Sequence, residues 1–256
     1  MATDDPGRPA LNRPAGWTSD LPTPKVALAV GAHPDDVEFG CGGTLAKWAQ
    51  DGCTVHHLIC TDGSKGTWDV DADTVALVGI RQVEQRQAAR LLAGDRAGEV
   101  RFLGQVDGEL SSELSLREQV VSVVRQLRPD VVLGHDPWKR YRIHPDHRHA
   151  GFLTVDAIAS ARDPHAFGDQ GLAAHRPAAL LLFEADEPDH VEDIAGTVAA
   201  KLAALEAHRS QFESTMYAAD DTELSAFRDR VTSRLAELGA PHGLAAAEVF
   251  KRIDQL

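Results

Sequence analysis

Short apolar runs alternate with longer segments of helical periodicity from residue 25 onward. The apolar runs predict buried strands at 26–30, 55–60, 100–103, 131–133 and 179–183. The helical segments predict helices at 41–51, 73–92, 113–127, 145–161, 194–207 and 219–238. Strands separated by helices of this length are typical of βαβ units. We therefore expect an α/β, Rossmann-like fold, with a largely parallel, doubly wound sheet of about five or more strands and flanking helices.

The first 24 residues lack this pattern. They contain five of the thirteen prolines and no apolar run (Pro6, Pro9, Pro14, Pro22 and Pro24). We expect an extended N-terminal arm over 1–24, followed by a single domain over 25–256. No run approaches the roughly 18–20 apolar residues that a membrane span needs, and the arm has no signal-peptide core. These features favour a cytoplasmic protein without a membrane span.

Composition narrows the class of function. The chain has 256 residues, 43% of them hydrophobic, with 26 Lys and Arg against 39 Asp and Glu, a net charge of −13. This excess of acidic residues argues against a nucleic-acid partner, because binding to phosphates requires a basic surface. The three cysteines form no CxxC pair, so we expect no disulfide framework. A homo-oligomer is compatible with the sequence, which does not decide the oligomeric state.

Two clusters of histidine and aspartate follow predicted strands. His33-Pro34-Asp35-Asp36 follows the first strand, and His144-Pro145-Asp146-His147 follows the fourth. Ligands of doubly wound sheets bind outside the carboxyl ends of the strands, so both clusters fall where a site is expected. Each tetrapeptide alone is also compatible with an ordinary turn or helix start. Two such clusters at the same sheet edge favour a functional site.

Together the clusters offer a three-ligand metal site. His33 and Asp36 are three residues apart, so one turn of chain can direct both side chains to one point, and His147 can complete the set. Two imidazoles and one carboxylate suit Zn²⁺ with an open fourth position. The same donors also suit Fe²⁺ or Co²⁺.

Three neighbouring residues are candidates for acid–base chemistry. Asp35, beside a ligand, is expected to take a proton from the attacking water as general base. His144, one helical turn before His147, is expected to stabilise an oxyanion or to protonate a leaving group. Asp146 is expected to pair with an imidazole or to support the helix N-terminus.

These residues resemble the PIG-L/LmbE-like family of N-acetylglucosaminyl deacetylases. The resemblance runs collinearly over about residues 26–253. The matching stretches are Ala32-His33-Pro34-Asp35-Asp36 with Gly42-Gly43-Thr44, Thr61-Asp62-Gly63, Arg81-x-x-Glu84, Asp107-Gly108, His144-Pro145-Asp146-His147, Lys201…His208-x-Ser210-Gln211 and Glu248-x-Phe250.

The resemblance implies a Rossmann-like fold and zinc-dependent removal of an N-acetyl group from an N-acetylglucosamine-type amino sugar or its conjugate. By position it implies the ligands and the general base already inferred, with His144 as electrostatic or acid partner tuned by Asp146. It also implies that Arg81 and Asp107 contact sugar hydroxyls. One departure stands before the second cluster, because Arg142 occupies the place where some relatives have tyrosine.

Other interpretations remain open. The enzyme could be a metal-dependent amidase acting on a thiol conjugate or another acylated amine, or the chain could be a non-catalytic module that binds a sugar or nucleotide. Arg81 could simply pair with Glu84 on a helix face. Lys139 and Arg140, before the second cluster, could clamp an anionic group or form a solvated loop. Histidines without a partner at ligand spacing are expected at the surface: His149, His165, His175, His190 and His242.

Overall fold

The structure, a computed structural model, describes residues 14–256, and in this part of the chain eight strands form one sheet with the order β1-β7-β8-β6-β5-β2-β3-β4. The strands are β1 (Thr18–Ser19), β2 (Val26–Gly31), β3 (Thr54–Thr61), β4 (Ala97–Gln105), β5 (Val131–His135), β6 (Ala179–Phe183), β7 (His190–Asp193) and β8 (Ala247–Ile253).

The expected α/β class with a largely parallel sheet is confirmed. Strands β4, β3, β2, β5 and β6 are parallel neighbours, whereas β8 pairs antiparallel with both β6 and β7. The helices that connect and flank these strands are α1 (Asp36–Gln50), α2 (Thr74–Ala93), α3 (Leu114–Leu127), α4 (Pro145–Ala161), α5 (Val198–Leu205) and α6 (Asp221–Gly239).

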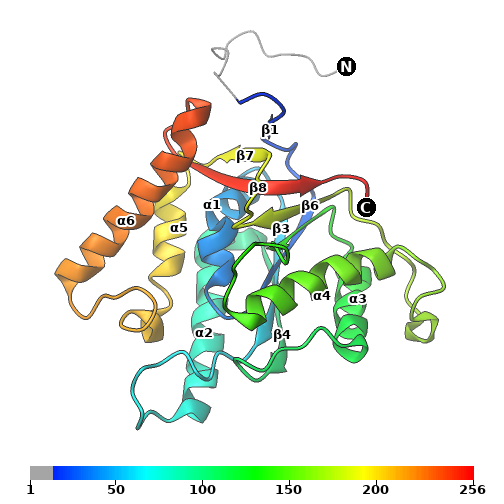
Figure 1. Cartoon of the computed structure of the whole chain (residues 1–256), viewed down its shortest axis with the longest axis horizontal. Coiled ribbons are helices and arrows are strands. Elements are labelled where there is room, and N and C mark those ends of the chain that lie inside the picture. The colour runs from blue at the N-terminus through cyan, green and yellow to red at the C-terminus, as the bar shows by residue number, and fades with distance from the viewer. Residues whose placement is uncertain (1–13) are drawn as a thin grey trace.

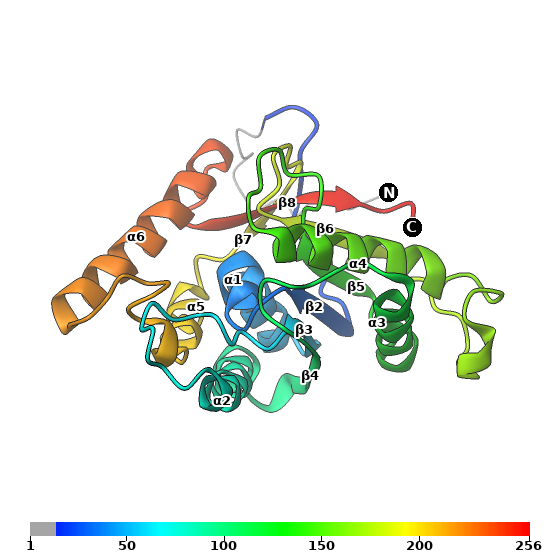
Figure 2. The ribbon, with the colours of Figure 1, turned by 60° about the horizontal axis from the view of Figure 1, so that its bottom comes forward.

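The helices cover both faces of the sheet. Helices α3 and α4 lie together on one side, and α1, α2 and α5 lie on the other, with α6 outside them (Figure 1 and Figure 2). Because side chains alternate along a strand, β2 supplies both cores. Leu28 and Val30 pack toward α3 and α4, whereas Ala27 and Ala29 face α1, where the fully buried Trp48 lies.

Helix α1 begins five residues before the start that the sequence pattern predicts. The difference arises at a glycine-rich segment, which weakens the helical signal and contains Cys41 with a non-helical φ of −150°. The glycines allow close packing: a Cβ on Gly40 would lie 2.6 Å from the Phe183 ring, and one on Gly43 would lie 2.6 Å from Ile194.

The periodicity did not predict β1, β7 or β8. Strand β1 has two residues, and β7 and β8 interleave polar with apolar side chains, so neither forms an apolar run. The arm expected over 1–24 falls partly outside the described residues, which start at 14, and its described part contains β1. The expectation of surface positions is wrong for His190 and His242, whose exposed fractions are 0% and 2%.

The strand order reverses between β2 and β5. From β2, the next strands in sequence, β3 and β4, extend the sheet in one direction, whereas β5 and β6 extend it in the other. The connections that leave the carboxyl ends of β2 and β5 therefore run in opposite directions. This leaves a crevice between the two strand ends, where doubly wound sheets bind ligands. None of the helices in residues 14–256 has the length and apolar character needed to cross a membrane.

Candidate metal centre and active site

A tight turn after β2 carries the first histidine–aspartate cluster. Gly31 at its start allows close packing, because a Cβ there would lie 3.1 Å from the Cβ of Asp36. Asp35 has φ +104°, a strained backbone conformation for a residue other than glycine. The Asp36 carboxylate accepts a hydrogen bond from the backbone N–H of His33 at 2.7 Å. The turn thus directs both side chains of the cluster into the crevice.

The structure brings His33, Asp36 and His147 together. Nδ1 of His33 lies 3.3 Å from Nε2 of His147, and the two carboxylate oxygens of Asp36 lie 3.5 Å from the first and 3.4 Å from the second of these nitrogens. Tetrahedral coordination at about 2.0–2.2 Å places ligand atoms roughly 3.3–3.6 Å apart. Each pairwise separation is compatible with two ligands of one divalent ion, although the two Asp36 distances involve different oxygens. The groups of donor atoms that all lie close to one another include His33 with His144 and His147, and Asp36 with His135 and His147.

The ionisation of Asp36 and His147 suits metal binding, whereas that of His33 does not: burial alone would lower the pKa of His33, but Asp107, Asp146 and Asp36 raise it well above its usual value. Burial alone would raise the pKa of Asp36, but His147 and His135 hold the pKa of this carboxyl well below its usual value. Burial lowers the pKa of His147 and Asp36 opposes this effect, whereas His135 and His33 add to the lowering, so that the net pKa is about 4. A charged carboxylate and a neutral imidazole are the forms that bind metals.

The other nitrogen of His33 faces two carboxylates. Nε2 lies 3.0 Å from Oδ2 of Asp146 and 3.2 Å from Oδ1 of Asp107. Asp146 is fully buried and also accepts hydrogen bonds from the backbone N–H groups of Gly108, at 2.6 Å, and Leu110, at 3.1 Å. A carboxylate behind a ligating histidine fixes the ring and its tautomer. The side chain of Asp146 thus contacts and orients His33, whereas the resemblance implies that Asp146 tunes His144.

Asp35 lies beside this cluster without joining it. Its backbone N–H donates to Oε1 of Gln85 at 3.0 Å, and its carboxylate lies 3.3 Å from Nη2 of Arg81. Burial raises the pKa of Asp35, Arg81 opposes this effect and Asp36 adds to it, so that the net pKa is about 6. A proton acceptor with this pKa, held next to a metal site, has the properties of a general base.

Arg81 and Asp107, the residues that the resemblance implies for sugar contacts, both line the cavity at the site. Arg81 is only 3% exposed, and its guanidinium also donates to the carbonyl oxygens of Gly63 and Pro34. It is not paired with Glu84, whose carboxylate accepts from Ser210 instead. In this arrangement the Arg81 guanidinium pairs with the Asp35 carboxylate, and the Asp107 carboxylate contacts Nε2 of His33.

His144 caps helix α4. Its Nδ1 accepts a hydrogen bond from the backbone N–H of Asp146 at 3.3 Å, and Pro145 takes the first helical position, where no N–H is needed. The His144 ring meets the His33 ring edge-on at 4.7 Å between centroids and stacks on His147 at 5.0 Å. Its exposed face therefore borders the metal site, where it can reach a bound substrate.

Sequence reasoning missed His135, the last residue of β5. Its Nε2 lies 3.2 Å from Oδ2 of Asp36, and its ring stacks on His147 with centroids 4.3 Å apart. On its other side, Nδ1 lies 3.5 Å from Glu184, which is also paired with Arg142. The position of His135 at the carboxyl end of a predicted strand was the available signal, but no motif surrounds it.

A second buried polar cluster lies behind Asp35. Nε2 of His208 lies 3.3 Å from Oε2 of Glu38, and both side chains are fully buried. Gln85 donates to Oε1 of Glu38 at 2.8 Å and also contacts Nδ1 of His57. Gln85 accepts a hydrogen bond from the backbone N–H of Asp35, so this buried cluster helps to fix the position of Asp35.

A cavity of about 600 Å³ opens above these groups. The loop after β3 supplies one wall, and the segment after α5 supplies another. The two walls are joined by the indole N–H of Trp68, which donates to the carbonyl oxygen of Ser214 at 3.3 Å. The volume lies within the range of pockets that bind small organic ligands.

Comparison with known proteins identifies the family. Residues 28–158 match the PIG-L family, described as GlcNAc-PI de-N-acetylase. The chain belongs to the PIG-L family. This match includes both histidine–aspartate clusters and confirms the resemblance inferred from the motifs.

Three relatives that match this PIG-L chain are deacetylases. Diacetylchitobiose deacetylase from Thermococcus kodakarensis is 35% identical, over 75% of this chain and 72% of the relative. A deacetylase of 1D-myo-inositol 2-acetamido-2-deoxy-alpha-D-glucopyranoside from Rhodococcus erythropolis is 32% identical, over 73% of this chain and 81% of the relative. N,N'-diacetylchitobiose deacetylase from Pyrococcus horikoshii superposes with a TM-score of 0.81 at 29% identity, over 90% of this chain and 84% of that one. These PIG-L proteins are amide hydrolases, the class expected for this chain.

Proposed function

We propose that this chain is a metal-dependent hydrolase that removes the N-acetyl group from an N-acetylglucosamine-type amino sugar or its conjugate. The observation that carries the proposal is the convergence of the side chains of His33, Asp36 and His147, whose pairwise contacts are 3.3–3.5 Å long, with Asp35 in the same cavity. The family supports the reaction class, and the GlcNAc-type substrates of the relatives support the substrate class.

Zn²⁺ is the metal that we propose for the site, since two imidazoles and one carboxylate suit zinc, and Fe²⁺ or Co²⁺ could serve with the same donors. When bound, such an ion would polarise the acetamide carbonyl and lower the pKa of a water molecule in the site. Asp146 would keep His33 oriented toward the ion through the 3.0 Å contact with Nε2.

The chain's own residues supply the proton transfers. Asp35 takes the proton of the attacking water, because its carboxylate is held at the cavity by Arg81 and is basic enough to accept a proton near neutral pH. His144 faces the same cavity and stabilises the oxyanion or delivers a proton to the departing amine. Asp107 and Arg81 are also available to sugar hydroxyls at the cavity wall.

The alternatives fit less well. A thiol-conjugate amidase would use the same machinery, but the matching relatives act on acetylated amino sugars. A binding module without catalysis would need neither a base such as Asp35 nor three ligand atoms at coordination distance. The arrangement of donors and base therefore favours catalysis.

The test combines metal analysis with an assay for free amine. The purified protein is loaded with Zn²⁺, and fluorescamine is used to detect amine release from N-acetylglucosamine, diacetylchitobiose and N-acetylated amines that are not sugars. We expect about one metal ion per chain and amine release from the sugars alone. Amine release only from the compounds that are not sugars would overturn the substrate class, and no release from a metal-loaded protein would overturn the activity.

A further inference from the structure

A second cavity adjoins the candidate active site. It has a volume of about 480 Å³ and shares three of its lining residues, Phe39, Glu184 and Thr215, with the first cavity. The two cavities therefore lie next to each other and meet at these three residues. A ligand that reaches from the first cavity into the second would pass along these three side chains.

One wall of the second cavity is apolar and comes from α6. Phe227, Val231, Leu235 and Leu238 lie on one face of that helix and line the space. Phe227 also meets Phe39 of the boundary edge-on, with ring centroids 6.1 Å apart. At the rim, Tyr217 is 70% exposed. Such a wall favours an apolar group, above all an aromatic ring.

The charged residues of the cavity leave an excess of positive charge. Glu248 is neutralised by Lys201, at 2.6 Å, and Glu184 is paired with Arg142. Arg234 has only an exposed partner, Glu237, at 3.2 Å. The Lys139 ammonium has no hydrogen bond or ion pair with any of residues 14–256. Unlike the acidic chain as a whole, this cavity therefore attracts anions.

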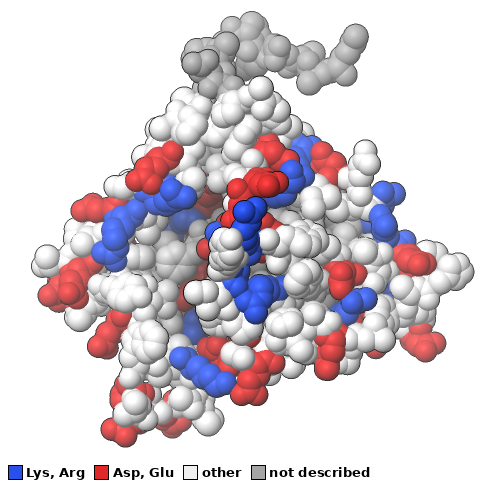
Figure 3. Space-filling view, in the orientation of Figure 1, with Lys and Arg blue, Asp and Glu red and all other residues white. Residues whose placement is uncertain are grey.

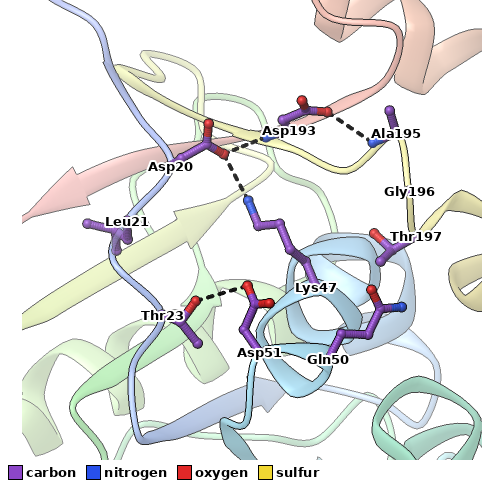
Figure 4. Close-up of a pocket in the computed structure, with 10 residues that line it drawn as sticks. All are labelled: Asp20, Leu21, Thr23, Lys47, Gln50, Asp51, Asp193, Ala195, Gly196 and Thr197. Carbon is purple, nitrogen blue, oxygen red and sulfur yellow. Dashed lines mark hydrogen bonds and ion pairs between the residues drawn. The ribbon is translucent and has the colours of Figure 1, made fainter. Parts of the chain in front are cut away.

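Figure 3 shows the same arrangement on the surface, where Lys and Arg side chains gather over α6 and over the centre of this face, on either side of a hollow. A cavity at the other end of α1 is different (Figure 4). There the Lys47 ammonium points to Asp20 at 2.9 Å and is also paired with Glu192, so its charge is already balanced. Unpaired positive charge is thus a property of the second cavity and not of every cavity.

We propose that the second cavity is the subsite for the aglycone of the substrate, and that this aglycone is an apolar group carrying an oxyanion, either a carboxylate or a phosphate. The proposal rests on the proposed function, since it takes the acetylated sugar to lie in the first cavity. The apolar face of α6 packs against the ring or alkyl part. Lys139 and Arg234 bind the oxyanion, and Arg230, whose guanidinium lies 5.8 Å from the centre of the Phe227 ring, adds to the positive potential.

The test compares four glycosides of N-acetyl-β-glucosamine with methyl, phenyl, para-carboxyphenyl and para-phosphophenyl aglycones. We expect kcat/KM to rise about threefold to tenfold from methyl to phenyl, and by a similar factor from phenyl to an anionic phenyl group. The two anionic glycosides distinguish a carboxylate from a phosphate.

Variants assign the preference to the cavity. Lys139→Gln and Arg234→Gln are expected to lower the ratio of kcat/KM between anionic and neutral phenyl glycosides. Leu238→Trp, which fills the apolar wall, should lower the ratio between phenyl and methyl glycosides, and Tyr217→Ala at the exposed rim tests the same contact without altering the core. Arg162→Gln, an exposed arginine directly after α4 and outside both cavities, is the matched control and should change neither ratio.

A binding measurement separates this proposal from the proposed function. The same four aglycones on glucosamine, the deacetylated form, are titrated calorimetrically into the metal-loaded protein. The same ranking, weakened in the variants, supports the subsite even if no glycoside is deacetylated, in which case only the proposed activity fails. Equal affinity for all four aglycones, or a preference that survives in every cavity variant, would overturn the subsite.

Discussion

Nη1 of Arg142 lies 2.7 Å from Nδ1 of His147. A guanidinium only donates hydrogen bonds, so Nδ1 of this imidazole must be the acceptor. A neutral ring then carries its own proton on Nε2, the nitrogen that faces His33 and Asp36. The contact with Arg142 and a metal ion on Nε2 of neutral His147 are therefore mutually exclusive.

From this competition we expect Arg142→Gln to bind Zn²⁺ more tightly than the unaltered chain, on the order of tenfold, because a competing donor and a nearby positive charge are both removed. Competition with a fluorescent chelator measures the dissociation constant. Arg140→Gln is the control, since the Arg140 backbone alone makes a hydrogen bond, to Asp186. Weaker binding in Arg142→Gln would mean that Arg142 supports the metal site.

Asp35→Asn should abolish most turnover and retain the metal. Asparagine keeps the size of the side chain and tolerates positive φ, which this position requires at +104°, so the fold should persist. Loss of a general base lowers kcat by roughly a hundredfold to ten-thousandfold. Metal analysis and an amine-release assay are performed on the same sample. Full turnover with bound metal would exclude Asp35 as the base.

Asp146→Asn should weaken metal binding without changing the ligands themselves. The carboxylate that accepts from Nε2 of His33 is lost, and partners of this kind contribute about tenfold to a hundredfold in metal affinity. Asp107→Asn is the informative comparison, because Asp107 contacts the same nitrogen at 3.2 Å. If neither variant changes the dissociation constant for Zn²⁺, these carboxylates do not orient His33.

The pair of His208 and Glu38 should make stability depend on pH. Burial alone would lower the pKa of His208, but Glu38 raises the pKa above the ordinary value of an unfolded histidine. A group of this kind stabilises the fold fully below about pH 6.5, and the contribution disappears as the pH rises through its folded pKa. We therefore expect the difference in unfolding free energy between the unaltered chain and His208→Gln to be largest near pH 5.5 and to shrink above neutrality.

Urea unfolding of the metal-free proteins from pH 5.5 to 9 tests this expectation. The other histidines titrate in both proteins and cancel in the difference. A difference that grows with rising pH would show that His208 is neutral in the folded state at all these pH values.

Lys201→Met should destabilise the fold by about 3–5 kcal/mol. The ammonium of Lys201 lies 2.6 Å from the Glu248 carboxylate, and both side chains are buried. The carboxylate also accepts from the backbone N–H groups of Gly43 and Thr44, so it stays held in this buried position after its partner is lost. Denaturant unfolding measures the change. Arg234→Met, which breaks an exposed pair, should alter stability little, and an equally small loss in Lys201→Met would contradict the argument.

The central fold could be predicted because its strands are buried on both faces. The strand expected at 179–183 and the helix expected at 145–161 have these bounds in the structure. Strands at the β1 side of the sheet could not be predicted in this way. Glu248, Lys251 and Arg252 interrupt β8, and its partners are set by packing against β6 and β7 rather than by an apolar run.

Only part of the candidate site could be predicted from the sequence. The spacing of two clusters was enough to propose that His33, Asp36 and His147 converge, because parallel strands end at one edge. Contacts made through the fold were not visible. His135 has no neighbouring motif, and the contact of Arg81 with Asp35 depends on how α2 lies against the turn after β2. The pairing of Asp146 and Asp107 with His33 likewise depends on how the elements pack.

The separation of the proposed ligands along the chain has a consequence for folding kinetics. His33 and His147 are 114 residues apart, and they meet because β2 and β5 pair in the register of Ala27 with Val131. Such a pairing closes a long loop and belongs to the slow part of folding. Metal uptake during refolding should consequently start only after this pairing. A chelator added to the folded protein should in turn lower its apparent melting temperature, because the ion binds the native chain in preference to the unfolded one.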